Sequence, residues 1–445
     1  MNQKMMPRLP RRAAFTLSAA ALAACSTPPK PKIPGVQIPV MPVTQALAPS
    51  PDAPAVTLPS PLPRTDWPQL LAGPDHAPGN VAGPTGFGRG WHAEIGTPGG
   101  ERQPLAASPV SAGGLVYTMD ADANICAFSL QSGERRWRTV TRPKHVTVTN
   151  LGGGIGYDAS GASPILYAST GYSEILALDA ATGKILWRRP LDFPARSAPT
   201  IGGGIVAVNI QNDMLLTFDP ASGEPGWRYT GRISSATTSV ALAGAPAIDS
   251  GIVVAGFASG TLAALDVNSG TPFWEQSLAS AFGQASDLDF SDITGAPVIA
   301  NGVAYAASLG QTMMAVDIRS GAKVWTIEAS GSEAFCAVGG FVFVLDTNCN
   351  LAAIHADDGL IAWTLRLPVF KNPKKKNGAK SWNGPVMINN ELILTSTLGD
   401  IVTVDPMAGK ISSHAQLAGP ADMPPIAVGG MLLQLTRNGI LTAYS

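Results

Sequence analysis

Residues 302–325 read GVAYAASLGQTMMAVDIRSGAKVW, and this stretch decides the fold. It opens with a short apolar run, residues 302–307, of the kind that forms a buried β-strand. Asp317 can then bond the backbone of a turn, and Gly321 tolerates the positive φ that ends it, so the two predict a tight hairpin. Trp325 follows on the next strand, where its ring can bury about 150–250 Å² against a neighbouring sheet.

The pattern apolar–Asp–x–x–Ser/Thr–Gly–x–x–apolar–Trp recurs along the chain, in some copies without the aspartate. The seven copies have their aspartate position at Ser129, Asp179, Asp219, Asp266, Asp317, His355 and Asp405. Successive copies lie 38 to 51 residues apart, a period that fits four short strands each. Only the seventh copy lacks the tryptophan, because Ser413 stands in its place. These repeats predict the blades of a β-propeller.

The two ends of the repeat region predict how the ring closes. Residues 426–444 supply inner strands but run out before an outer strand, and Arg89–Ala93 can supply it. Trp91 lies 46 residues before Trp137, in phase with the repeat. We therefore predict an all-β, eight-bladed propeller of four-stranded antiparallel blades over residues 65–445, closed by pairing its N- and C-terminal strands, which removes an exposed edge. Seven residues are predicted to dock one blade on the next: Trp91, Trp137, Trp187, Trp227, Trp274, Trp325 and Trp363.

The N-terminus has the layout of an export signal. Basic residues within 1–12 precede the small apolar run 13–24, which is too short to span a membrane comfortably. The end of that run resembles the bacterial lipobox, which implies lipidation of Cys25 after removal of residues 1–24. The Ser26 that follows favours the outer membrane by the same resemblance, with the protein anchored on the periplasmic face. Whether Arg11-Arg12 signals twin-arginine export instead of an ordinary basic region stays open.

A proline-rich segment follows the candidate lipidation site. Twelve prolines fall within residues 26–64, where they remove backbone donors and fix φ, so neither helix nor sheet is expected. We predict that residues 25–64 form a semi-extended tether between the lipid and the propeller.

Charge and cysteine content exclude several classes of protein. Charged residues make up 14% of the chain and the net charge is −1, so no nucleic-acid partner is expected. The main charged feature is the lysine-rich stretch 371–380, predicted as a solvated loop between blades, with contact to an acidic partner or anionic lipid as the alternative. Cys126, Cys336 and Cys349 show no metal-site spacing, and a Cys336–Cys349 bridge remains open.

The glycine runs 152–154 and 202–204 precede strands and not helices. A phosphate-binding loop needs the N-terminus of a helix, so both runs are predicted as hairpin turns.

The repeat resembles that of pyrroloquinoline-quinone (PQQ) type propellers, a group of quinoprotein dehydrogenases and non-enzymatic relatives. With the lipobox and tether, the chain looks like a member of the family of outer-membrane protein assembly lipoproteins. That resemblance implies a scaffold that docks on the barrel-forming subunit of the assembly complex, with unfolded outer-membrane protein precursors as a further class of partner. It places the contact on two interblade loops, at Ser239, Val240, Ala241, Leu242, Asp289, Ser291, Asp292 and Thr294. This chain departs from the family pattern at Ala241, where an arginine is expected, and at Thr294, where an aspartate is expected.

Two alternatives are kept beside the scaffold. A PQQ-dependent dehydrogenase would need a carboxylate base, a Ca²⁺ site and a cofactor pocket. The acidic residues outside turns are scattered, and the paired cysteines typical of that group are absent, so no catalytic residue, cofactor or metal is assigned. The second alternative is a lipoprotein that binds a cell-wall polymer.

Overall fold

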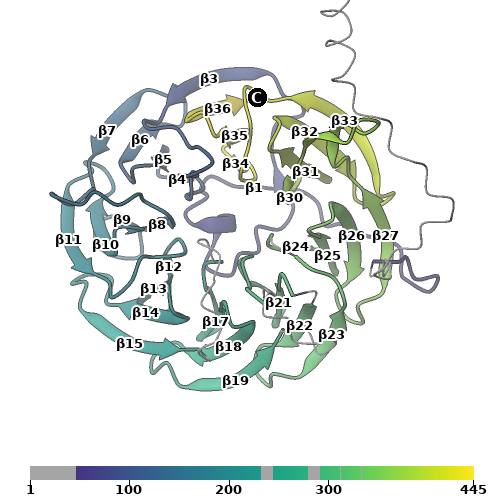
Figure 1. Cartoon of the computed structure of the whole chain (residues 1–445), viewed down its shortest axis with the longest axis horizontal. Coiled ribbons are helices and arrows are strands. Elements are labelled where there is room, and N and C mark those ends of the chain that lie inside the picture. Colours follow the sequence, from purple (N-terminus) through teal and green to yellow (C-terminus); the bar gives the residue numbers. More distant parts are fainter. Residues whose placement is uncertain (1–46, 232–243, 279–290, 311, 332) are drawn as a thin grey trace, which may run out of the picture. The chain divides into compact units, whose positions relative to one another are not determined.

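The computed structural model describes residues 47–231, 244–278, 291–310, 312–331 and 333–445. Within these ranges the chain is all-β apart from a short 3-10 helix, η1 (Leu70–Ala72). Eight sheets surround a common centre (Figure 1), and each contains four antiparallel strands, which are consecutive along the chain in seven of the sheets. The predicted eight-bladed propeller is therefore confirmed. No helix among the described residues is both long and apolar enough to cross a bilayer.

In the first four blades the strands follow chain order from the centre to the rim. Blade 1 contains β4 (Val110–Ala112), β5 (Leu115–Met119), β6 (Ile125–Ser129) and β7 (Arg135–Thr139); blade 2 contains β8 (Gly153–Asp158), β9 (Ile165–Thr170), β10 (Glu174–Asp179) and β11 (Ile185–Pro190). Blade 3 contains β12 (Thr200–Gly202), β13 (Ile205–Ile210), β14 (Met214–Phe218) and β15 (Pro225–Thr230); blade 4 contains β16 (Ala247–Asp249), β17 (Ile252–Gly256), β18 (Thr261–Asp266) and β19 (Pro272–Ser277).

The next three blades keep the same order. Blade 5 contains β20 (Val298–Ala300), β21 (Val303–Ala307), β22 (Met313–Asp317) and β23 (Lys323–Ile327); blade 6 contains β24 (Cys336–Val338), β25 (Phe341–Leu345), β26 (Asn350–His355) and β27 (Ile361–Arg366). A small hairpin, β28 (Phe370–Asn372) and β29 (Asn377–Ala379), separates blade 6 from blade 7. Blade 7 contains β30 (Trp382–Ile388), β31 (Glu391–Ser396), β32 (Asp400–Asp405) and β33 (Lys410–Gln416), and is extended at its inner edge by β2 (Val81–Ala82) and β1 (Leu62–Pro63).

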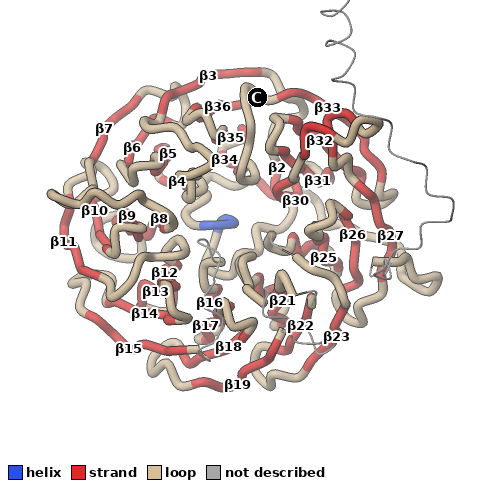
Figure 2. The backbone as a smooth tube through the Cα atoms, viewed as in Figure 1, coloured by secondary structure: helices blue, strands red, loops and turns tan. Residues whose placement is uncertain are grey.

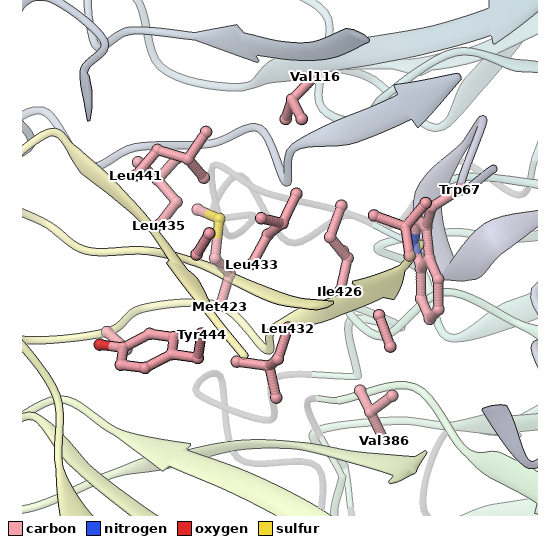
Figure 3. Packing of buried hydrophobic residues seen from close by; sticks show 14 of the residues in the cluster. Trp67, Val116, Val386, Met423, Ile426, Leu432, Leu433, Leu435, Leu441 and Tyr444 are labelled. Atoms are coloured by element: carbon pink, nitrogen blue, oxygen red, sulfur yellow. The ribbon is translucent and has the colours of Figure 1, made fainter. Parts of the chain in front are cut away.

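Blade 8 closes the ring with strands from both ends of the propeller. Its inner strands are β34 (Ile426–Val428), β35 (Met431–Leu435) and β36 (Ile440–Tyr444), and β3 (Arg89–Glu94) pairs with β36 as the outer strand. Leu441 and Tyr444 are buried in a cluster that also holds Val116 of blade 1 and Val386 of blade 7 (Figure 3). The predicted split blade is therefore confirmed.

A tryptophan ring lies at seven seams between blades. Each indole Nε1–H donates to a carbonyl oxygen in the Asp-to-Gly turn of the next blade, at 2.7–3.1 Å. The pairs are Trp91–Leu130, Trp137–Ala180, Trp187–Pro220, Trp227–Val267, Trp274–Ile318, Trp325–Ala356 and Trp363–Pro406. The eighth seam begins at Ser413 and meets blade 8, where β36 and β3 come from opposite chain ends and no such turn exists. The missing tryptophan therefore coincides with the missing turn.

The turns themselves are built by the repeat aspartate and glycine. In blade 4 the Asp266 carboxylate accepts hydrogen bonds from the backbone of Asn268 and Ser269, and the Gly270 N–H donates to the Asp266 carbonyl. Those bonds, led by the one from the Ser269 backbone, hold the pKa of Asp266 below its usual value. Gly270 has φ +69°. The predicted hairpin turn is thus explained by one side chain and one backbone conformation.

An N-terminal segment, residues 57–83, runs around the centre of the ring and includes η1 (Figure 2). We call it the belt. It forms hydrogen bonds with the inner part of seven blades, with donor-to-acceptor distances of 2.6–2.9 Å. The hydrogen-bonded pairs are Arg64–Gly429, Trp67–Ser111, Pro68–Tyr157, Gln69–Ile201, Pro74–Ile248, Asp75–Ile299 and Val81–Asn389. At blade 6 the Thr57 carbonyl lies against Gly339, where a Cβ would sit 2.2 Å from the oxygen. The belt therefore supplies hydrogen-bond partners to backbone groups at the inner edges of the blades.

The boundary between tether and propeller differs from the prediction. Leu47 and Val56 are each 7% exposed and pack in the cores of blades 5 to 7. The Ser50 N–H donates to the Ile361 carbonyl of β27 at 2.8 Å, and Thr364 donates to the Leu47 carbonyl at 2.7 Å. Residues 47–64 are therefore part of the propeller, and residues 25–46, Cys25 among them, lie outside the described ranges.

The structure also tests the predictions for the two glycine runs and for the cysteines. Residues 202–204 form the turn between β12 and β13 as predicted, but Gly153 and Gly154 begin the inner strand β8. The turn prediction at 152–154 was wrong because these glycines provide close backbone approach: a Cβ on Gly153 would lie 2.1 Å from the Ser169 carbonyl oxygen. The three described cysteines are free and buried, so Cys336 and Cys349 are not bridged. Burial raises the pKa of the Cys336 thiol to about 12.

Candidate partner-binding site

The predicted contact residues fall in the connections that enter blades 4 and 5. Five of them, Ser239, Val240, Ala241, Leu242 and Asp289, lie outside the described residues. Ser291, Asp292 and Thr294 are described and immediately precede β20. Ser291 and Thr294 are half-buried, whereas Asp292 is buried.

The Asp292 carboxylate forms an ion pair with the Arg196 guanidinium. Its Oδ2 lies 3.3 Å from Arg196 Nη2, and each side chain is 3% exposed. Burial lowers the pKa of the Arg196 guanidinium, and the facing Asp292 carboxylate opposes that shift. Removing one member of such a pair leaves an uncompensated buried charge, at a cost of about 3–5 kcal/mol.

The pair joins two distant connections of the propeller. Arg196 lies between β11 and β12, where blade 2 leads into blade 3. Its backbone N–H donates to the Asn209 carbonyl of β13 at 2.9 Å. Asp292 lies 96 residues later, between blades 4 and 5. The pair therefore fixes the residues just after 279–290 to the inner part of blade 3.

The described residues that follow the two predicted loops also meet each other. A Cβ on Gly244 would lie 2.4 Å from the Gly295 carbonyl oxygen, so the two backbones are in contact. The Asn209 side chain donates to the Gly244 carbonyl at 3.0 Å. The structure thus brings the ends of the two predicted loops together over blades 3 to 5, with the ion pair beneath them.

Sequence reasoning missed Arg196. It stands outside the repeat motif, in a connection whose sequence gives no sign of its partner. A buried arginine needs a counter-charge, but that rule identifies Asp292 only once the fold is known.

The space beside the ion pair is small. A cavity of about 90 Å³ lies beside the pair, lined in part by Ser108, Ile155 and Arg196. Small-molecule sites usually exceed roughly 300 Å³. Within the described ranges, no group of three or more His, Cys, Asp or Glu side chains is placed to hold a metal ion.

Comparison with known proteins links the chain to one family. Residues 142–365, just over half of the chain, match the family model described as outer membrane protein assembly factor BamB. The BamB of Yersinia pestis is 24% identical over 340 residues, which cover 75% of this chain and 80% of that protein.

Solved structures agree on the fold. BamB from Moraxella catarrhalis superposes with a TM-score of 0.67 at 20% identity, over 81% of this chain and all of that one. A quinohemoprotein alcohol dehydrogenase from Comamonas testosteroni reaches a TM-score of 0.60 at 15% identity, over 85% of this chain and 80% of that one. Since scaffold and enzyme share the fold, only the family match separates them. The chain belongs to the family of the outer membrane protein assembly factor BamB.

Proposed function

We propose that this chain is a non-enzymatic, lipid-anchored scaffold of the machinery that assembles outer-membrane β-barrel proteins. Membership of the BamB family carries the proposal, because that family consists of assembly factors and not enzymes. The protein would be held on the periplasmic face of the outer membrane through a lipidated Cys25. Its partner would be the barrel-forming subunit of the assembly complex, and unfolded barrel precursors would be a second class of partner.

In this proposal the contact is made by the two loops at residues 238–244 and 287–294. Ser239, Val240, Ala241, Leu242, Asp289, Ser291 and Thr294 would meet the partner directly. Asp292 would act differently, since its carboxylate is bonded to Arg196 inside the protein. We assign it to positioning: the ion pair would hold the loop ends where the partner finds them. This division accounts for a charged residue in the loop that does not reach the surface.

The test is retrieval of the barrel-forming subunit from detergent-solubilised envelopes by the tagged full chain. Leu242→Glu should abolish retrieval, because a charge in the contact loop opposes desolvation. Leu186→Glu is the matched control, since Leu186 is 50% exposed on β11, the outer strand of blade 2. Thermal melting should be the same for both variants. Retrieval of the subunit in equal amounts by both variants would exclude these loops, and its absence from the wild-type eluate would refute the scaffold.

A further inference from the structure

The lysine-rich stretch forms a projecting hairpin in place of the predicted loop. Strands β28 and β29 pair only with each other, through Phe370 with Ala379 and Asn372 with Asn377. Between them, residues 373–376 form the turn, which carries Lys374, Lys375 and Lys376. Lys371 adds a fourth ammonium group on β28.

The hairpin concentrates positive charge in a stretch of sequence that holds no acidic residue. Five of the twelve lysines in the chain fall within residues 371–380, and no acidic residue occurs between Asp358 and Glu391. Lys371, Lys374, Lys375 and Lys376 are exposed. None of these four has a carboxylate within 4.0 Å in the part of the chain that the structure describes.

The fifth lysine fastens the hairpin to blade 7. Lys380 Nζ lies 2.7 Å from Asp400 Oδ2 and 5.3 Å from the centre of the Trp382 ring. Burial alone would raise the pKa of Asp400, but bonds from Lys380, Ser396 and His414 outweigh it and hold the pKa at about 2. The Lys380 N–H also donates to the Val369 carbonyl at 3.0 Å. The base is therefore fixed, and the four other lysines are presented outward on an ordered support.

The start of the described chain runs along the outer strand that leads to the hairpin. The hairpin begins four residues after β27 ends at Arg366, and along that strand Thr364 donates to the Leu47 carbonyl while Ser50 donates to the Ile361 carbonyl. Cys25 precedes Leu47 by 22 residues. At about 3.3–3.6 Å per residue when fully extended, 22 residues reach at most about 80 Å.

We propose that the four exposed lysines of this hairpin bind anionic phospholipid headgroups, so that the rim at blades 6 and 7 faces the bilayer. The inference rests on the lipid anchorage within the proposed function. Lysine is a mobile point charge suited to a diffuse anionic surface, whereas protein interfaces favour arginine and aromatic residues and are poor in lysine. The turn carries no arginine and no aromatic residue. Binding by this rim would leave the ends of the partner loops, at blades 3 to 5, free for the assembly complex.

The test places a fluorophore on the hairpin of the lipidated full chain in vesicles. Asn377→Cys provides the attachment point, and the native described cysteines are buried and poorly reactive. Headgroup-labelled nitroxide lipid should quench the dye in phosphatidylcholine vesicles that contain one quarter phosphatidylglycerol. Quenching should fall in pure phosphatidylcholine and in 0.5 M salt. Each lysine should contribute about fivefold at low salt, so replacing all four by glutamine should lower the bound-to-free ratio of the hairpin at least tenfold.

The controls distinguish binding by the hairpin from a general attraction of the positively charged protein surface to anionic vesicles. Glutamine at Lys144, Lys184, Lys323 and Arg135, which are all exposed and lie outside blades 6 and 7, removes the same charge elsewhere and should leave quenching unchanged. A dye at Asn268→Cys, on the turn of blade 4, should report no contact. Equal quenching with and without phosphatidylglycerol would overturn the proposal. So would a hairpin variant that keeps vesicle contact but loses a co-purifying acidic protein. Failure here would leave retrieval of the barrel-forming subunit unaffected.

Discussion

Seven of the eight seams of this propeller each depend on one missing atom. The tryptophan of one blade lies against the turn glycine of the next, and a Cβ on that glycine would overlap the ring. At Gly270 it would lie 2.5 Å from the Trp227 ring, and at Gly183 2.4 Å from the Trp137 ring. Real Cβ atoms do not approach that closely, so the glycine is required by the neighbouring blade as well as by its own turn.

Gly270→Ala should therefore destabilise the protein more than a change in backbone preference explains. Gly251 in the same blade is the matched control, because its φ is +80° and a Cβ there would meet nothing within 4 Å. Gly251→Ala should cost about 1 kcal/mol through φ alone, and Gly270→Ala about 2–4 kcal/mol through φ and displacement of the ring. Denaturant midpoints followed by tryptophan fluorescence compare the two. Equal losses would show that the ring moves aside freely.

Residue spacing predicts such pairs only where they repeat. The tryptophan and the glycine recur at the same spacing in the copies of the repeat, so the role inferred for them in one copy applies to the others. The Arg196–Asp292 pair occurs once and joins residues 96 positions apart, so no repeated spacing in the sequence predicts it. Its position depends on the curvature of the ring, which local sequence does not encode.

At the scale of elements, the belt is the least regular segment and the most widely connected. It has almost no regular secondary structure, so a proline-rich sequence gave no reason to expect contacts with every blade. The buried His76 fixes it to blade 5: its Nδ1–H donates to the Pro297 carbonyl at 2.8 Å. Burial lowers the pKa of His76 from 6.5 to about 4, although the bond to Pro297 opposes the shift.

Belt docking should consequently weaken in mild acid. Between pH 6.5 and about 4 the unfolded chain binds a proton at His76 that the folded protein does not. The free energy of unfolding should fall by about 1.4 kcal/mol per pH unit over that window and not further below it. His76→Asn retains a donor and tolerates the φ of +61°, so it should remove this part of the pH dependence.

Denaturant midpoints at pH 7.5, 6 and 5 measure the effect as the difference between variant and wild type. His145→Asn is the control, since His145 is exposed and also has a positive φ, of 69°. An identical pH slope for wild type and His76→Asn would show that the histidine is protonated without cost in the fold.

At the scale of the whole molecule, closure of the ring was predictable because it follows from the number of repeats in the sequence. Seven internal copies and two incomplete ends leave one arrangement that removes both edges, and β3 pairs with β36 as that count requires. The belt and the lysine hairpin were not predictable in this way, since each occurs once and lies outside the repeat. Periodic sequence therefore predicts the ring, and single segments decide what the ring contacts.

Closure should also control cooperativity, and removal of residues 440–445 tests this. The deletion takes away Leu441 and Tyr444, which are 0% and 2% exposed, and leaves β3 and β35 as open edges. Loss of two large buried side chains costs about 4–8 kcal/mol, comparable with the whole stability of a domain. The truncated chain should lose its single sharp melting transition, bind hydrophobic dyes and associate through its edges. Adding the peptide NGILTAYS, residues 438–445, should restore the transition by refilling blade 8, whereas a scrambled peptide should not. A truncated chain that melts as sharply as the intact one would show that each blade is stable without a closed ring.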